Sequence, residues 1–327
     1  MKIVIPNFPE PDSFVDNVVF TLKAMGHDVV TPLKRLGRSR YVSLNVAREF
    51  WQKAFPQSWT PAEKWVVAMA RQNPPDMVLC LTQSLRQEML EELRKCGVTR
   101  LVAWWGDTPA NMRGMGLLAK GWDLIFIKDA AAVAKFRAVG LDAELLHEAM
   151  NPAWHKRMFK AIGQEVVVAG NYYGYRQYLV ARLLDAGVPM VLYGQKPPLW
   201  AELCVKKAHT GRYITKEEKS EVFGSGLACL NSTALSEGNS LNCRAFEIAG
   251  TCGLQLIENK PAVADCFEPG LEVLTYSSVD EIVEHLQRAR KDPKWALSVR
   301  EAGHARANAH HTYEMRLAYI LKQIDLK

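Results

Sequence analysis

Residues 231–253 read NSTALSEGNSLNCRAFEIAGTCG, which predicts a strand end, a polar loop that contains glycine, and then a helix. A helix that starts just after a strand and a loop can hold phosphate, because its first backbone N–H groups point at the ligand. Arg244 falls in the predicted first turn, where the helix dipole disfavours a cation unless an anion is present. Glu247 follows on nearly the same helix face. A diphosphate and a ribose would suit this pair of side chains.

Short apolar runs and helical patterns alternate on both sides of this segment. We predict strands at residues 2–5, 27–31, 77–81, 101–104, 124–127, 144–146, 165–169, 190–193, 226–230, 254–257 and 272–275. Helices are expected at residues 13–25, which Ser13 could cap, and at 84–96, 130–139, 176–186, 216–223, 280–290, 293–308 and 312–324, with a mostly helical region at 35–72 and a further helix ending at 120. Such alternation indicates parallel sheets that are covered on both faces.

The alternation breaks at residues 147–164, where Asn151-Pro152 is a turn signal. We therefore predict an α/β protein of two facing Rossmann-like domains with a central cleft. The first domain would span residues 1–150 and the second 151–310, with a C-terminal helix at 311–327 that could pack back on the first. In such sheets ligands lie outside the carboxyl ends of the strands.

Composition and charge narrow the function classes. The 327 residues carry a net charge of +6, which suits an anionic ligand and tolerates nucleic acid, without the dense Lys/Arg clustering of a dedicated DNA-binding module. Seven scattered cysteines form no C-x-x-C pair and are expected to be free thiols in a reducing cytoplasm. No apolar run approaches the roughly 20 residues that span a bilayer, so we expect no integral membrane contact.

Several residues of the second predicted domain lie where strands end. Gly170, and Gly174 in the same loop, either shape a turn or let a backbone or a ligand approach closely. Gly194 follows Tyr193 at the end of the next strand. Arg176 opens a helix, where a cation again favours an anionic partner. Tyr193 could line a nucleobase pocket or belong to the core. Further polar candidates for the same ligand lie in the loop before the helix of Arg244, and these are Asn239, Ser240 and Asn242.

Two acidic residues of the opening segment need partners. The flanking sequence AFEIAG indicates a buried helix, where an unpaired carboxylate is costly. Glu247 therefore needs a hydroxyl ligand or a paired arginine, and an internal ion pair with Arg244 on a solvated face is the alternative. Glu237 lies in the preceding loop, from which it could reach a substrate.

Asp107 is the leading catalytic candidate of the first domain. It follows a predicted strand in AWWGDTP, and the two tryptophans would desolvate its carboxylate, as suits a general base. Alternatively, Asp107 caps the following turn. Asp12 and Asp16, after the first strand, are further candidates. No convincing metal site is predicted, because the adjacent His310 and His311 would diverge on a helix.

Three motifs in the second half resemble those of the CgeB-like glycosyltransferases, which are similar to the wider glycosyltransferases of GT-B fold. They are R-x-F-E with a following glycine turn (244–253), F-E-P-G-x-E-V (267–273) and H-T-Y (311–313). The resemblance covers about residues 165–320. The first half is similar more loosely, through PPDMVLCL, VAWWGDTP and DLIFIKD.

The resemblance implies a hexosyl- or pentosyltransferase in which the second domain binds a nucleotide sugar and the first binds the acceptor. It implies no metal and no cofactor beyond the nucleotide sugar as co-substrate, with a UDP-sugar preferred. By this analogy Glu247 holds the ribose hydroxyls, and Arg244 holds the leaving diphosphate. Nine residues separate Glu237 from Glu247, whereas many GT-B enzymes have seven. This departure leaves the role of Glu237 and the retaining or inverting outcome open.

We therefore predict a metal-independent glycosyltransferase with a glycan, a protein or a small molecule as acceptor. A hydroxylated base in DNA is an alternative acceptor, because residues 34–65 mix cations with aromatic side chains, although an amphipathic helical face gives the same pattern. The alternative from another class is a non-catalytic nucleotide-sugar binding protein. A nicotinamide oxidoreductase fits poorly, because the loop PNFPEPD after the first strand lacks G-x-G-x-x-G.

Overall fold

The computed structural model describes residues 1–36, 43–44, 46–47, 50–51, 55, 59–82, 85–107, 116–158 and 161–326. The chain divides into two compact units, of which the first comprises Met1–Leu146 with Leu317–Lys327 and the second comprises His147–Arg316. Much of the basic and aromatic stretch 34–65 lies outside the described residues, and so does Ser84, the expected first residue of a helix.

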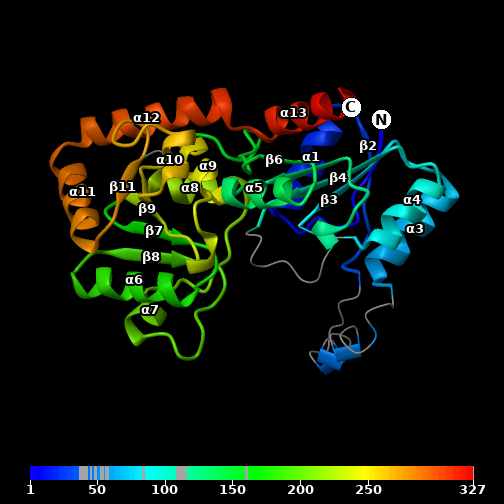
Figure 1. Cartoon of the computed structure of the whole chain (residues 1–327). Helices are drawn as coiled ribbons and strands as arrows, with labels where there is room; N and C mark the ends of the chain where they lie inside the picture. Colours follow the sequence, from blue (N-terminus) through cyan, green and yellow to red (C-terminus); the bar gives the residue numbers. More distant parts are fainter. Residues whose placement is uncertain are drawn as a thin grey trace. The chain divides into compact units, whose positions relative to one another are not determined.

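The first unit contains a parallel sheet of order β2-β1-β3-β4-β5-β6 (Figure 1). Its strands are β1 (Lys2–Val4), β2 (Asp28–Val30), β3 (Met77–Leu81), β4 (Arg100–Trp105), β5 (Leu124–Ile127) and β6 (Ala143–Leu145). Its helices are α1 (Phe14–Ala24), α3 (Pro61–Gln72), α4 (Gln87–Lys95), the 3-10 turn η2 (Gly116–Leu118) and α5 (Ala130–Ala138).

Strand periodicity explains how both faces of this sheet are covered. Alternate residues of a strand point to opposite faces. Trp105 packs in one apolar cluster with buried residues of α3, α4 and α5, whereas the ring of Trp104 lies 4.8 Å from that of Phe14 in α1. The all-apolar β3 and β5 are buried along their whole length, as expected for strands covered on both sides.

Helix caps in this unit follow from the sequence. Ser13 caps α1 by accepting the N–H of Asp16 at 3.1 Å, as predicted. Thr60 and Glu63 form a reciprocal capping box at the start of α3. These local hydrogen bonds satisfy N–H groups that the first turn of a helix leaves open.

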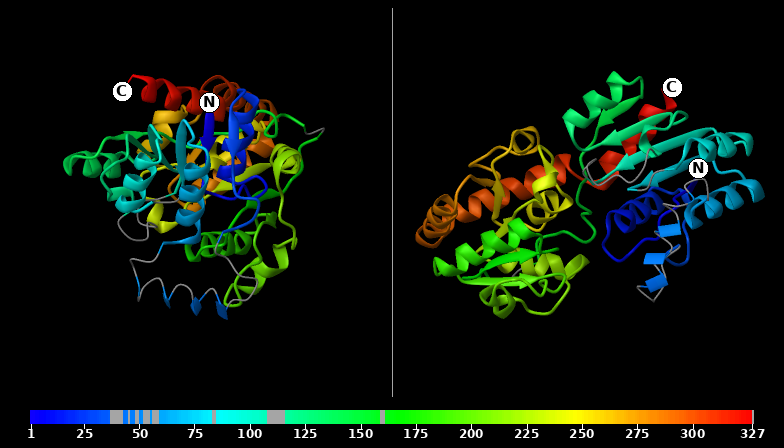
Figure 2. Two further views of the ribbon diagram at one scale, coloured as in Figure 1. Left: turned by 90° about the vertical axis from the view of Figure 1, so that its right-hand side faces the viewer. Right: turned by 60° about the horizontal axis from the view of Figure 1, so that its bottom comes forward.

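The C-terminal part of α13 (Tyr313–Asp325) belongs to the first unit. The Tyr319 hydroxyl donates to Glu144 at 2.7 Å, and its ring packs edge-on against Phe126. Arg100 pairs with Asp325 at 2.9 Å. Figure 2 shows this last helical segment, in red, lying along the first sheet. The chain therefore crosses from the second unit back to the first before it ends.

The second unit contains a parallel sheet of order β11-β10-β9-β7-β8. Its strands are β7 (Val166–Ala169), β8 (Met190–Tyr193), β9 (Ala228–Asn231), β10 (Gln255–Glu258) and β11 (Leu274–Tyr276). Its helices are α6 (Gly174–Asp185), α7 (Leu203–Ala208), α8 (Lys216–Ser225), the 3-10 turn η3 (Leu235–Glu237), α9 (Cys243–Gly250), α10 (Pro261–Cys266), α11 (Val279–Lys291) and α12 (Pro293–His310).

A buried arginine joins three elements of this unit. Arg300 of α12 is 1% exposed, and its guanidinium donates to the carbonyls of Gly224, Gly226, Leu227 and Cys252. These carbonyls lie at or just beyond the C-terminal ends of α8 and α9, where helices leave acceptors without intrahelical partners. Burial lowers the pKa of Arg300. Its hydrogen bonds hold α8, α9 and α12 together.

An aromatic cluster joins α9 to two distant segments. The ring centroid of Phe246 lies 5.8 Å from that of Phe267 and 5.1 Å from that of His311. The centroids of Phe267 and His311 lie 5.2 Å apart. Burial lowers the pKa of His311 to about 4, so this ring is neutral at pH 7. Contacts between distant segments of this kind fix the orientation of α9.

The predicted α/β class with two parallel sheets is confirmed, and most predicted strands and helices are found with ends that differ by a few residues. The short α7, α10 and η3 are not anticipated by the sequence pattern. Within the described residues, no helix combines the length and the apolar character that crossing a bilayer requires.

Two glycines let β7 and β8 end side by side. Gly170 has φ +119° and Gly194 has φ +117°. The Gly170 N–H donates to the Tyr193 carbonyl at 3.1 Å, and a Cβ on Gly194 would lie 2.7 Å from the Gly170 nitrogen. Both conditions, the positive φ and the close backbone approach, require glycine at position 194.

We predict that Gly194→Ala lowers the free energy of unfolding by about 2–5 kcal/mol, through left-handed strain and overpacking. Chemical denaturation measures the loss. Gly174→Ala is the matched control, because Gly174 has no positive φ and nothing within 4 Å of the position of a Cβ. Equal stability of the two variants would contradict the close approach.

Candidate functional site

Residues predicted from separate parts of the sequence meet at the carboxyl edge of the second sheet. A Cβ on Gly170 would lie 2.5 Å from Arg244 Nη2 and 3.3 Å from Arg176 Nη1. Both guanidinium groups therefore lie against the backbone at the end of β7. Gly194 and Tyr193 end the neighbouring β8 beside Gly170. This edge is where parallel sheets bind ligands.

Arg176 is 1% exposed and binds protein groups with its donors. Its Nε donates to Ser232 Oγ at 2.9 Å, and its terminal nitrogens donate to the carbonyls of Ser232 and Asn171. Arg176 thus ties the loop after β7 to the loop after β9. Burial lowers its pKa, and the nearby Arg244 lowers it further. An anion bound here would offset this repulsion between two cations.

Arg244 is half-buried in the first turn of α9. Its Nη1 donates to Asn231 Oδ1 at 3.2 Å. In the part of the chain that the structure describes, Arg244 makes no ion pair with a carboxylate. The site therefore holds two neighbouring guanidinium groups, neither of which pairs with a carboxylate among the described residues, and it suits a multiply charged anion.

Asn231 orients Arg244 and was missed by sequence reasoning. Its fully buried side chain accepts from Arg244 and, at 3.2 Å, from Asn242 Nδ2, and it donates to Gln255 Oε1 at 3.1 Å. The available signal was an asparagine that ends the apolar strand ACLN. A buried amide at a strand end requires partners, but the sequence does not show which.

The loop before α9 has distinct roles for its polar residues. Asn239 Oδ1 accepts the N–H of Ala262 at 2.8 Å and so caps α10. Ser240 Oγ donates to the Glu237 carbonyl at 2.8 Å, which closes the loop on itself. Asn242 is the N-cap residue of α9 but makes no capping hydrogen bond with its side chain, and among the described residues its buried Oδ1 has no hydrogen-bond partner. Asn242 Oδ1 is therefore an acceptor in this loop that a ligand donor could use.

The N-terminus of α9 differs from the expected phosphate cradle. The N–H of Cys243, the first residue of the helix, donates to the Glu148 carboxylate at 3.0 Å. Glu148 is buried, and a carboxylate at a helix N-terminus is favoured by the helix dipole. This N–H is therefore already satisfied, so the positive charge that could meet an anion here lies on the arginine side chains.

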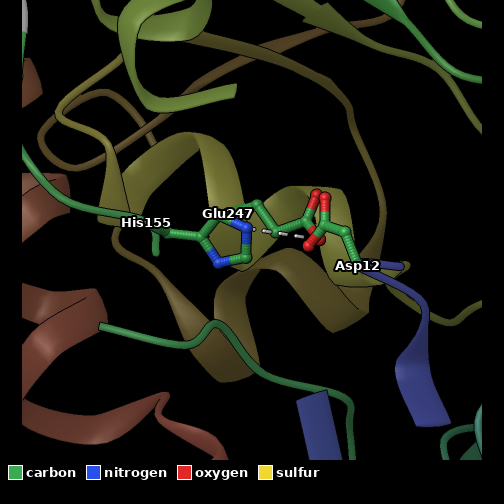
Figure 3. Close-up of side chains that lie close together, drawn as sticks. All are labelled: Asp12, His155 and Glu247. Carbon is green, nitrogen blue, oxygen red and sulfur yellow. Dashed lines mark ion pairs between the residues drawn. The ribbon is translucent and has the colours of Figure 1, made fainter. Parts of the chain in front are cut away.

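Glu247 has a different ion-pair partner from the arginine that the sequence suggested. Lys219 Nζ of α8 lies 3.0 Å from each Glu247 carboxylate oxygen. His155 Nε2 lies 3.9 Å from Oε1 of the same carboxylate, and Figure 3 shows the imidazole ring pointing toward it. The alternative of an Arg244–Glu247 pair on a solvated face is wrong, since Glu247 is buried and pairs with Lys219.

Lys219 and His155 were also missed by the sequence analysis. Lys219 lies in KEEKSEVFGS, where a lysine looks like part of a solvated face. His155 ends a tight turn in which Asn151 Oδ1 accepts the N–H of Ala153 at 3.1 Å. Both are far in sequence from Glu247, so only the fold brings them together.

The candidate carboxylates of the first unit follow two strands at one edge of its sheet, two in loops and Asp16 in the first turn of α1. The Asp12 N–H donates to Asp16 Oδ2 at 2.8 Å, and Asp12 has φ +58°. These two residues follow β1, whereas Asp107 follows β4 and is half-buried. Residues 108–115, which come next, lie outside the description. The structure thus brings Asp12 and Asp16 together and places Asp107 at the end of another strand.

Comparisons with known proteins bear on this arrangement. Residues 167–322 match the protein family described as Glycosyl transferase-like. Sucrose-phosphate synthase from Thermosynechococcus elongatus is similar in structure at 13% identity, with a TM-score of 0.71 over 100% of this chain and 99% of that chain. HepE from Anabaena, in complex with UDP-glucose, is 10% identical, with a TM-score of 0.68 over 100% of both chains. The lipopolysaccharide outer core galactosyltransferase WaaB is 12% identical, with a TM-score of 0.61 over 99% of both chains.

At these identities the structural likeness shows the fold, and it covers both units of the chain. The fold is that of the GT-B glycosyltransferases, as predicted. No curated protein matches the chain by sequence.

We predict that inorganic pyrophosphate binds the wild-type protein through the two guanidinium groups and raises its melting temperature. Arg244→Ala should weaken this binding about tenfold or more, because it removes charge-assisted hydrogen bonds worth about 1.5–3 kcal/mol. Isothermal titration calorimetry measures both affinities. Arg182→Ala is the control, since Arg182 pairs with Asp185 and Glu202 instead. Equal loss in both variants would show a nonspecific charge effect.

Proposed function

We propose that this chain, a glycosyltransferase of GT-B fold, transfers a sugar from a nucleoside-diphosphate sugar to an acceptor hydroxyl, with a UDP-sugar as the preferred donor. The observation that carries the proposal is the pair of guanidinium groups of Arg176 and Arg244 against Gly170. They lie at the carboxyl edge of the second sheet, where a diphosphate would neutralise them. The match of residues 167–322 to a glycosyltransferase family supports the same assignment.

Arg244 would act on the leaving group. As the bond between the anomeric carbon and the diphosphate oxygen breaks, negative charge grows on the diphosphate. A guanidinium held in advance by Asn231 stabilises that charge without having to reorganise during the reaction. Two fixed arginines can supply this stabilisation from the protein itself.

Glu247 would accept hydrogen bonds from the ribose hydroxyls. It lies three residues after Arg244 on α9, so one helix presents a cation for phosphate and a carboxylate for the sugar of the nucleotide. Tyr193, half-buried at the end of β8, would line the base. The solved complexes of HepE with UDP-glucose, with UDP and glucose and with UDP support a uridine donor.

The acceptor would bind through the first unit, with Asp107, or else Asp12 or Asp16, removing the proton from its hydroxyl. A glycan, a protein or a small molecule remains our proposed class of acceptor. Modified DNA was suggested by residues 34–65, about half of which the structure does not describe, and no observation on the described residues favours it.

A finer assignment also belongs to this proposal. The motifs around Phe246, Phe267 and His311 support a place among the CgeB-like glycosyltransferases, and all three lie in one cluster.

The seven cysteines are free thiols, which supports a cytoplasmic location.

A panel of nucleotide sugars tests the donor. We expect UDP-hexoses to raise the melting temperature. At about 100 times its Kd, a bound ligand adds about 2.7 kcal/mol to the free energy of unfolding. The best donor should also be hydrolysed slowly to UDP without an acceptor. Binding without any hydrolysis or transfer would favour a non-catalytic binding protein, and the absence of any thermal shift across the panel would reject the proposal.

The leaving-group role of Arg244 has its own test. Arg244→Ala should lower the rate of donor hydrolysis by about tenfold or more at saturating donor, because a charge-assisted contact stronger in the transition state is lost. Arg244→Lys keeps the charge but not the planar guanidinium. Its rate of donor hydrolysis should therefore lie between those of the wild type and Arg244→Ala. An unchanged kcat with a raised KM would instead assign Arg244 to ground-state binding.

A further inference from the structure

We propose that Lys219 is a positioning residue that holds the Glu247 carboxylate in the orientation needed to bind a vicinal ribose diol. The inference rests on the proposed function, in which Glu247 receives the nucleotide ribose. It adds a residue from a different helix, α8, to the machinery that recognises the donor.

The ion pair has a geometry that fixes the carboxylate. Lys219 Nζ is 3.0 Å from Oε1 and 3.0 Å from Oε2, so a single ammonium group bridges both oxygens. The Lys219 side chain is 14% exposed and that of Glu247 only 3%. With both oxygens tethered to one nitrogen, rotation of the carboxylate about its last bond would break a hydrogen bond.

This arrangement leaves acceptor capacity on the carboxylate. An ionised carboxylate offers about four lone-pair directions, and the bridging ammonium uses one on each oxygen. The remaining pair, one on each oxygen, matches two hydroxyl donors on adjacent carbons. A ribose presents such a pair in its 2′ and 3′ hydroxyls.

His155 approaches the same carboxylate from the segment between the two sheets. Its Nδ1 accepts the backbone N–H of Asn151 at 3.1 Å, which places the proton of the neutral ring on Nε2. That nitrogen lies 3.9 Å from Oε1, beyond hydrogen-bond distance. Lys219 therefore makes the shorter contact with Glu247, and the lysine sets the plane of the carboxylate.

Burial explains why this position needs a cation. Glu247 is almost inaccessible, and an ionised carboxylate without a partner is strongly disfavoured there. Arg244 is directed to Asn231 and Gly170, so it does not serve this purpose. Separate cations thus serve separate parts of a nucleotide, with Arg244 at the phosphates and Lys219 behind the ribose-binding carboxylate.

The test is the preference for ribose over 2′-deoxyribose, measured by calorimetry with UDP, GDP and ADP and their 2′-deoxy counterparts. We expect the wild-type protein to bind its best diphosphate about tenfold or more tightly than the deoxy form. Lys219→Met and Glu247→Gln should each reduce this preference to about threefold or less. Lys219→Arg should restore most of it, and Lys207→Met, an exposed lysine of α7, should leave it unchanged.

A phosphate readout separates positioning from a general loss of structure. Lys219→Met should bind pyrophosphate as the wild type does, because Arg244 is untouched. If Lys219→Met does not fold, the charge-balanced double variant Lys219→Met/Glu247→Gln is compared with Glu247→Gln alone. Affinities of the double variant and of Glu247→Gln for the best nucleoside diphosphate that agree within about twofold support action through Glu247. A double variant at least about fivefold weaker would show that Lys219 contacts the ligand itself, and would overturn the proposal.

The remaining outcomes distinguish this inference from the proposed function. If the wild-type protein binds none of the diphosphates, both fall. If it binds one of them but without a ribose preference, the ribose-binding role of Glu247 and the positioning role of Lys219 are both overturned, and the diphosphate-binding part of the proposed function stands. If Lys219→Met keeps the full preference, only the positioning role of Lys219 is overturned.

Discussion

Two arginine side chains fill the space that any side chain at position 170 would need, and the arrangement of the second unit's carboxyl edge depends on this packing. Gly170 and Gly194 allow β7 and β8 to end in backbone contact. Arg176 then links the loops after β7 and β9, and Asn231 directs Arg244 over the same backbone. Positive charge is thus concentrated by hydrogen bonds that also hold the loops in place, so the proposed anion site and the local stability depend on the same contacts.

Helix α9 carries the other half of the site, and its charges are fixed from outside the helix. Glu148 satisfies its first N–H group, and Lys219 of α8 neutralises Glu247 in its second turn. A buried helix with one half-buried cation and one buried anion would be unstable without these partners. The neighbouring elements therefore stabilise α9 and at the same time determine which of its charges face a ligand.

The sequence predicted those features that depend on local pattern. Strand and helix periodicity fixed the α/β class, Ser13 was identifiable as a cap, and a close approach was one of two readings for Gly170, whereas the closer backbone approach at Gly194 was not predicted. Partner choice could not be predicted, because Glu247 lies 28 residues from Lys219 and Cys243 lies 95 from Glu148. The same local sequence would be compatible with an arginine or a lysine beside Glu247, and only the packing of α8 against α9 decides between them.

The three motifs that carried the family resemblance gain a physical meaning from the aromatic cluster. Phe246, Phe267 and His311 come from separate motifs and pack ring against ring. On α9, Phe246 turns into this cluster, whereas Arg244 and Glu247, three residues apart, share another face. The motifs therefore specify the rotation of α9 about its axis. Because that rotation decides where the guanidinium and the carboxylate lie, substitutions in the cluster would alter ligand binding without any contact with the ligand.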